Sequence, residues 1–464
     1  MAVLRFVDSI QASPTVRLNL NDLSVWGMSN ETSFGTPEMK RSVTSSMMRD
    51  GDYVGASAYG NRVLNLVLHL FHAGDNAATQ LQLLQRELDR PTNLLQYTPG
   101  GTTNTVFFRT FRTPPESVRW DIGLKQVRVQ VLAEPFALGL REDIGPITVN
   151  NNPAAGSNGL FADLTGIKGD VETPLMIEYA DGGGGLARNG FSIGVRSGPS
   201  PYPNRFLQAE SMNQNTDTSA VADAAFSGGN KSRCTFTTQQ VLTTRISGKF
   251  PSATVPSGAE NWGVYRVFAR VAQTVAGDVM QMDLFIGNAS TSVVTIKSQT
   301  AAQLVDLGTV DSTFGTPTAG GYAASEYRIE DQPSITGPLL VRAGRVSGSG
   351  SLDIDYVVFV PADECFGTWT YSSNVTSATH LSVVDAVSDS FYTATALSGA
   401  TPGRLSHGFP VAITGRLPRV MPGNNRLVIV ESSEFPGAAN AITTSITATI
   451  RYWPRYLLTR PLTT

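Results

Sequence analysis

The sequence contains few cysteines and charges and has no long apolar run. Its 464 residues include two cysteines, Cys234 and Cys365, so a framework of several disulfides is excluded. We expect two free, buried thiols, although the sequence also permits one long-range bridge. No segment approaches the roughly eighteen consecutive apolar residues of a membrane helix. The N-terminal residues also lack the apolar core of a signal peptide, so we expect synthesis in a cytoplasm without membrane insertion.

Charge is scarce and nearly balanced. Charged residues make up 16% of the chain, below the roughly 25% of an average soluble domain. The formal net charge is -3 and the isoelectric point is near 5.9. Binding of phosphate backbones needs a concentrated basic surface, so this balance argues against nucleic acid as a partner.

Motifs for catalysis are missing as well. The chain has four histidines and contains no zinc-protease or Walker sequence. Asp353 and Asp355 alternate with apolar residues and are expected on one face of a strand, where two carboxylates are the minimum for a glycosidase. That face could equally hold a cation or meet solvent. We therefore predict a protein that is not an enzyme, with hydrolase as the open alternative.

Glycine, proline and β-branched residues are plentiful. The 44 glycines and 26 prolines supply many turns, and abundant Thr and Val favour strands. Residues 62–70 alternate as in a strand, and a helix is predicted from Ala77 to Leu88, capped by Asp75 or Asn76 and ended by Pro91. The predicted fold class is mainly β: a sandwich or barrel scaffold with one helix and an inserted β-sandwich.

Changes in composition predict three segments. Residues 141–160 lose periodicity and gain Asn, Pro and Gly, which indicates a linker. A second boundary is expected between Pro361 and Gly367. The predicted domains are a scaffold domain at 1–150, an inserted domain at 151–365 and a C-terminal β segment at 366–464 that either completes the scaffold or folds alone. Short strands separated by Gly- and Ser-rich turns predict a sandwich in the middle segment.

The middle segment resembles a known kind of module. Its sequence from Leu207 to Ser211, the run Trp262–Val271 and the run Leu352–Phe359 are similar to carbohydrate-binding jelly rolls that contain calcium. The resemblance implies a structural calcium ion held by an early glutamate and by the aspartate of the last strand. The matching positions are Glu210 and Asp355, and carboxylate oxygens are the ligands that calcium prefers.

Aromatic side chains of the same segment are candidates for sugar binding. Sugar rings stack on exposed aromatic rings, and Trp262, Tyr322 and Tyr327 are the candidates. The other interpretation is that such rings pack in the core, which fits Tyr265 within an apolar strand. The resemblance itself places no aromatic platform.

The flanking segments resemble distal tail and minor tail proteins of long-tailed bacteriophages of the siphovirus type. The similar parts are Gly60–Leu66, the helix ending in Arg86-Glu87-Leu88, Leu94–Tyr97 and the run Leu417–Leu427. This resemblance implies a structural protein of the virion. Such a protein forms a ring, expected to be a homo-hexamer, between the tail tube and the other tail-tip proteins of the baseplate.

The two resemblances together predict a host-attachment role. A ring pairs exposed sheet edges between its subunits, and a jelly roll on each subunit multiplies weak contacts with host cell-wall glycans. We expect the protein in the phage tail, after synthesis in the host cytoplasm. One alternative is a secreted protein that binds or cleaves glycans, and another is a decoration or fibre protein elsewhere on the virion.

Overall fold

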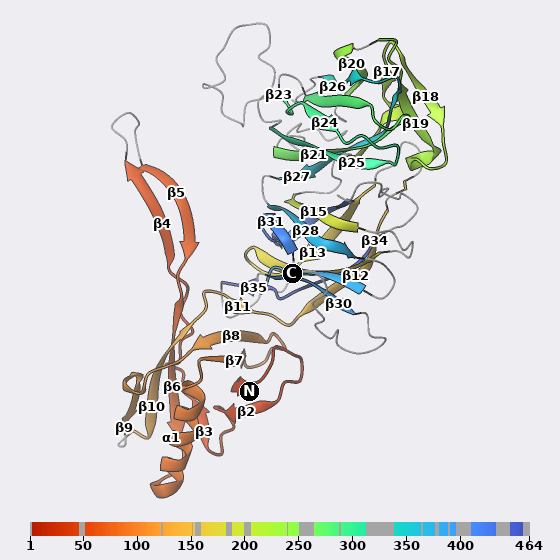
Figure 1. Ribbon diagram of the computed structural model, residues 1–464. Coiled ribbons are helices and arrows are strands. Elements are labelled where there is room, and N and C mark those ends of the chain that lie inside the picture. Colours follow the sequence, from red (N-terminus) through yellow and green to blue (C-terminus); the bar gives the residue numbers. More distant parts are fainter. Residues whose placement is uncertain are drawn as a thin grey trace. The chain divides into compact units, whose positions relative to one another are not determined.

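A computed structural model describes most of the chain. The described residues are 2–45, 52–121, 124–150, 152–153, 159–181, 188–198, 206–238, 240–249, 264–286, 289–311, 338–362, 365–375, 380–387, 390–395, 410–432 and 446–457. Over these residues the fold is mainly β, with several sheets and one α-helix, which confirms the predicted fold class (Figure 1). The chain divides into two compact units. Unit 1 comprises Met1–Glu142, Lys168–Thr173 and Tyr452–Thr464, and unit 2 comprises Asp143–Ile167 and Pro174–Arg451.

Unit 1 is built on an antiparallel sheet in the order β2-β1-β7-β8-β10-β6-β3. The predicted strand at 62–70 is confirmed as β6, and its alternation leaves Leu64, Leu66, Leu68 and Leu70 in the core. The strands of this unit and of its separate hairpin β4–β5 are β1 (Val3–Val7), β2 (Val16–Asn19), β3 (Trp26–Met28), β4 (Met39–Ser45), β5 (Asp52–Tyr59), β6 (Arg62–Leu70), β7 (Thr92–Thr98), β8 (Val106–Phe111), β9 (Val118–Asp121), β10 (Gln126–Ala133) and β11 (Ala137–Leu138).

The helix α1 (Gly74–Leu88) packs its apolar face on this core through Ala77, Leu84 and Leu88. The predicted cap was wrong, because the helix begins one residue before Asp75. Its N-cap position is Ala73, which has no side chain able to accept a backbone hydrogen bond. The helix therefore depends on packing rather than on a capping side chain.

The C-terminal end of the chain returns to unit 1. Strand β35 (Arg455–Tyr456) pairs with β11. The buried guanidinium of Arg62 donates hydrogen bonds to the carbonyl oxygens of Pro135 (2.7 Å) and Leu457 (3.0 Å). Burial lowers the pKa of Arg62 to about 10. Residues near both ends of the sequence thus complete one fold.

Unit 2 contains two sheets that we call the host region, formed by residues 143–167, 174–198 and 365–451. One sheet has the order β12-β34-β14-β29-β30 and the other β13-β33-β15-β28-β31. Their strands are β12 (Glu142–Val149), β13 (Phe161–Ile167), β14 (Thr173–Asp181), β15 (Arg188–Ser197), β28 (Cys365–Val375), β29 (His380–Asp385), β30 (Ser390–Thr395), β31 (Pro410–Gly415), β32 (Arg419–Val420), β33 (Gly423–Ser432) and β34 (Ile446–Tyr452).

The linker predicted at 141–160 was wrong over residues 142–149, which form β12. This strand is mostly exposed, so its sequence shows no regular apolar alternation, and its hydrogen-bonding partner β34 lies some three hundred residues further along the chain. Strands from both sides of residue 365 also share a sheet, since β15 pairs with β28 and β33. The host region is therefore split in sequence by the segment between β15 and β28.

That segment forms the inserted module, residues 206–361. Its two antiparallel sheets run in the orders β18-β19-β27-β21-β25 and β17-β20-β26-β22-β23. Between them lies one apolar core that includes Tyr265, Met282 and Phe359. The strands are β16 (Phe206–Gln208), β17 (Asn213–Gln214), β18 (Thr218–Ala222), β19 (Asn230–Cys234), β20 (Gln240–Lys249), β21 (Val264–Gln273), β22 (Val279–Ile286), β23 (Ala289–Ser290), β24 (Val294–Ile296), β25 (Gln303–Asp311), β26 (Pro338–Ser347) and β27 (Leu352–Pro361).

A second apolar cluster, the junction cluster, attaches the inserted module to the host region. Phe268, Tyr356 and Val358 project from the module onto Val428 and Val430 of β33. Strand β27 is buried along its whole length because one face meets the module core and the other meets this cluster. The module is thus packed on the host region and not merely tethered to it.

Candidate functional site

The residues predicted from sequence fall into two groups. Trp262, Tyr322 and Tyr327 lie outside the described residues. Glu210 and Asp355 are described: Glu210 lies in a short 3-10 turn, Ala209–Ser211, and Asp355 lies in β27. This turn contacts β27 and β19, so two residues far apart in sequence come close together in the inserted module.

Glu210 is a buried carboxyl group with unpaired oxygens. Both side-chain oxygens are inaccessible to solvent, and neither accepts a hydrogen bond from any other residue that the structure describes. Burial, followed by the nearby negative charge of Asp355, raises the pKa of Glu210 to about 7. A buried carboxylate is costly unless it is neutralised, so this group needs either a proton or a cation.

Asp355 is buried but has partners. It lies at a bulge, because β21 pairs Arg270 with Tyr356 and the next residue with Ile354. Its carboxylate accepts a hydrogen bond from the backbone N–H of Ser227 (2.9 Å) and forms an ion pair with the buried Arg270. Burial nevertheless raises the pKa of Asp355 to about 6, because desolvation outweighs the attraction of the arginine.

Asp353 is paired even more fully. Arg233 holds it in a two-pronged ion pair (2.7 and 2.9 Å), and the buried ammonium of Lys231 lies 2.8 Å from it. Asp353 and Asp355 therefore each form an ion pair with a different arginine. Such neutralised, buried carboxylates do not form the pair of accessible acids that glycoside hydrolysis needs.

The residues around Glu210 fit a calcium ion in part. Calcium takes six to eight oxygen ligands, and Glu210 supplies two buried oxygens with no other bonding role. The side-chain oxygen of Gln214 is also buried and unpartnered, and its amide nitrogen is bonded to the carbonyl of Ala209 beside Glu210. Asp355 fits less well, since Ser227 and Arg270 already occupy its oxygens.

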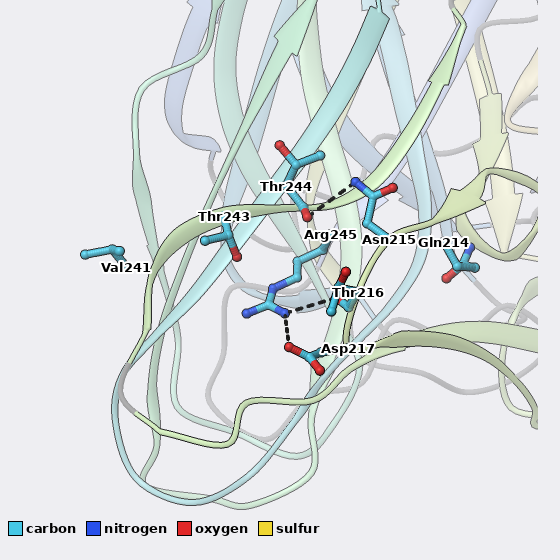
Figure 2. A pocket seen from close by; sticks show the side chains of 8 residues that line it. All are labelled: Gln214, Asn215, Thr216, Asp217, Val241, Thr243, Thr244 and Arg245. Atoms are coloured by element: carbon cyan, nitrogen blue, oxygen red, sulfur yellow. Dashed lines mark hydrogen bonds and ion pairs between the residues drawn. The ribbon is translucent and has the colours of Figure 1, made fainter.

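A polar pocket of about 780 Å³ lies beside this region, between the β17–β18 turn and β20 (Figure 2). Sequence reasoning missed it, because its residues come from two separate stretches and include no aromatic ring. Figure 2 shows Arg245 directed at Thr216 and Asp217. The lining residues are Gln214, Asn215, Thr216, Asp217, Val241, Thr243, Thr244 and Arg245.

Unit 1 carries large apolar side chains on its surface. Val63 of β6 and Leu132 of β10 are directly paired across the sheet, and each is 44% exposed. They lie on the face opposite the core. Most of the exposed large apolar side chains among the described residues belong to this unit: Val16, Leu23, Met39, Val63, Phe71, Leu83, Trp120, Leu124 and Leu132.

Three other features that could carry function are a cluster of metal-ligating side chains, a reactive thiol and a membrane-spanning helix, and the described side chains form none of them. Within the described ranges, no group of three or more His, Cys, Asp or Glu side chains is placed to hold a metal ion. Cys234 is a free, buried thiol, and burial raises its pKa to about 12, so it is unreactive at neutral pH. No helix in the described part of the chain combines the length and apolar character needed to cross a bilayer.

No protein-family model matches the sequence, and no curated protein matches it significantly. Among solved structures, the chain is similar to the Dit protein (gp 19.1) of phage SPP1, described as a paradigm of the hub adsorption apparatus in phages that infect Gram-positive bacteria. The identity is 9% and the TM-score 0.37, over 98% of this chain and 99% of that one.

Two structures of the activated phage p2 baseplate are also similar. The structure with strontium has 9% identity, the one with calcium has 7%, and both have a TM-score of 0.23 over 76% of this chain and 97% of theirs.

Proposed function

We propose that this chain is a non-enzymatic structural protein of a bacteriophage tail tip. It assembles as a ring of identical subunits, a hexamer, that joins the tail tube to the host-recognition apparatus. The inserted module then faces host cell-wall glycans. The support is the resemblance of the flanking sequences to tail proteins, together with the exposed apolar side chains of unit 1 and the packed module in unit 2.

An exposed apolar pair in unit 1 carries the assembly part of the proposal. Contiguous apolar groups on a protein surface are typical of protein–protein contacts. The cross-strand pair Val63 and Leu132 places two such groups side by side on a regular sheet. A closed ring buries the same patch in every subunit and leaves no patch exposed.

The junction cluster supports the recognition part. Phe268, Tyr356 and Val358 fix the module on the host region through apolar packing. A rigidly held module loses less conformational freedom when it binds than a tethered one does. Several modules on one ring would then convert weak individual contacts into strong attachment.

We also propose that Glu210 holds a calcium ion that stabilises the inserted module. The two buried oxygens without partners support this assignment, and the oxygen of Gln214 is placed near the same turn. A bound cation would supply charge neutralisation to the Glu210 carboxylate. Asp355 contributes negative charge nearby, while its own oxygens remain bonded to Ser227 and Arg270.

A second candidate function is a secreted glycan-binding protein, which the polar pocket of the module favours without requiring a ring. Its glycan-cleaving version gains no support from Asp353 and Asp355, since each carboxylate is paired with an arginine. This candidate predicts a monomer with no affinity for other tail proteins.

The deciding experiment is the mass of the purified full-length protein in solution, followed by negative-stain imaging. A closed ring of one size supports the tail-tip assignment, and a strict monomer at all concentrations favours the glycan-binding candidate. Mass spectrometry of purified virions tests the location directly. Absence of the chain from virions that contain the other tail proteins would refute the proposal.

A further inference from the structure

We propose that the pocket between the β17–β18 turn and β20 binds a neutral saccharide unit through two neighbouring hydroxyl groups. The inference deepens the proposed function and rests on its glycan contact, for which it supplies a site. The site consists of hydrogen-bonding groups, and none of the described residues that line it is aromatic. The occupant is a pyranose at the end or within a chain of a surface polysaccharide.

The pair formed by Asp217 and Arg245 is the centre of the site. The guanidinium of Arg245 lies 3.6 Å from the Asp217 carboxylate, 3.4 Å from the carbonyl oxygen of Thr216 and above the ring of Phe236 at 4.6 Å. Arg245 is 2% exposed, whereas the Asp217 side chain is 39% exposed. The arginine is therefore fixed, and the carboxylate is accessible to a ligand.

The backbone holds Asp217 in an unusual conformation. Its φ of 63° lies in the left-handed region, which costs energy for residues other than glycine, asparagine and aspartate. Thr235 donates two hydrogen bonds to the Asp217 carbonyl oxygen, from its backbone N–H (2.8 Å) and its hydroxyl (3.0 Å). This anchoring directs the carboxylate without relying on the ligand.

Gln214 forms part of the pocket wall in a fixed orientation. Its amide nitrogen donates to the carbonyl oxygens of Ala209 (2.8 Å) and Met212 (3.0 Å), so the amide cannot rotate freely. Its side-chain oxygen is inaccessible to solvent, so the groups offered to a sugar are those of Asp217 and the two threonines.

The lining excludes the other common classes of ligand. It contains one arginine and one aspartate, so its formal charge is zero, and an anion would have to displace Asp217 from Arg245. Val241 is its single large apolar side chain and is 85% exposed, so the pocket has no apolar groove for a lipid or an apolar peptide. The carboxylate accepts and the hydroxyls of Thr243 and Thr244 both donate and accept, which matches adjacent sugar hydroxyls.

The test uses the full-length protein and a panel of methyl glycosides of common hexoses and N-acetylhexosamines, observed by saturation-transfer NMR. We expect transfer to at least one glycoside. Asp217→Asn keeps a residue that tolerates the left-handed backbone but removes the charge, so affinity should fall about tenfold. Thr243→Val keeps the shape and removes one hydroxyl, with a loss of about threefold.

Asp306→Asn is the matched control. Asp306 also belongs to the module, is 42% exposed in its side chain and pairs with an arginine, Arg266. It should leave binding unchanged. The proposal is overturned if no glycoside receives saturation, or if Asp217→Asn and Thr243→Val bind like the control. Ring assembly and presence in virions are measured separately, so they succeed or fail independently of this site.

Discussion

Some side chains depart from the usual pattern of apolar groups inside and charged groups outside. In unit 1 these are mostly exposed apolar side chains, whereas in the inserted module they are mostly buried charged ones. Val63, Leu132 and Phe71 lie on the surface of unit 1. The module instead buries Lys231, Arg245, Arg270, Asp278, Asp283, Arg345, Asp353 and Asp355. Burying exposed apolar groups against a partner lowers the free energy of association. Buried charge pairs fix the geometry of the fold and add little net stability.

The proposed function assigns a different task to each of these surfaces. A surface that must associate can be chemically simple, because apolar contact is not directional. A surface that must recognise a hydroxyl pattern needs polar groups in fixed positions. In the proposal, unit 1 therefore serves assembly and the module serves recognition.

The largest effect is expected from removing one member of a buried pair. Asp355→Ala leaves the buried Arg270 without its carboxylate, which should destabilise the module by roughly 3–5 kcal/mol. Urea unfolding measures the loss. Asp306→Ala breaks an exposed pair with Arg266 and should cost less than about 1 kcal/mol. Equal losses for the two variants would show that the burial of the Asp355 pair has no energetic consequence.

Next in size is the loss of packing at the junction cluster. Phe268→Ala should cost roughly 3 kcal/mol and should loosen both the module and β33 of the host region, because the cluster contains residues of both. Phe359→Ala, in the module core, should loosen the module alone. Hydrogen exchange resolved along the chain distinguishes these outcomes. Unchanged exchange in β33 for Phe268→Ala would contradict mechanical coupling at the junction.

A smaller effect concerns the unpaired carboxyl of Glu210. Its folded pKa of about 7 lies above the ordinary value of 4.5 for a glutamate, so the folded state holds the proton more tightly. Stability is then fully present below pH 4.5 and falls as the pH rises towards 7. After allowance for partial exposure the loss is roughly 1–2 kcal/mol.

Thermal melts in a chelator at pH 5 and pH 8 measure this loss, and Glu210→Gln should reduce it. Asp355, whose pKa is raised to about 6, contributes a loss of the same sign that the variant retains. Calcium should restore stability at pH 8 in the wild type and not in Glu210→Gln. Equal melting temperatures with calcium and with chelator would argue against the calcium assignment.

The smallest effect on stability, with a large effect on association, is expected on the unit 1 surface. Val63→Arg combined with Leu132→Glu should change the stability of the isolated subunit by less than about 0.5 kcal/mol, because both side chains are exposed and the two new charges attract each other across the strands. The same change should prevent ring formation, as seen by light scattering. Val346→Arg in the module is the control, at 45% exposure. A ring that survives the double substitution would place the interface elsewhere.

The sequence alone determined the class of fold and several of its elements. Alternation over 62–70 is a local signal and correctly predicted β6, and apolar spacing predicted most of α1. The helix start was missed because Ala73 has no capping side chain. The exposed strand β12 was missed because its sequence lacks apolar alternation, and only pairing with β34 makes it a strand.

The tertiary structure alone decided which distant residues meet. Sequence placed Asp353 and Asp355 together as a pair of acids, but the bulge and the partners Arg233 and Arg270 made them two separate ion pairs. The pocket of Asp217 and Arg245 likewise depends on a turn meeting another strand. Periodicity reports which side of a strand is buried, whereas the identity of its neighbours depends on pairing between segments that are remote in sequence.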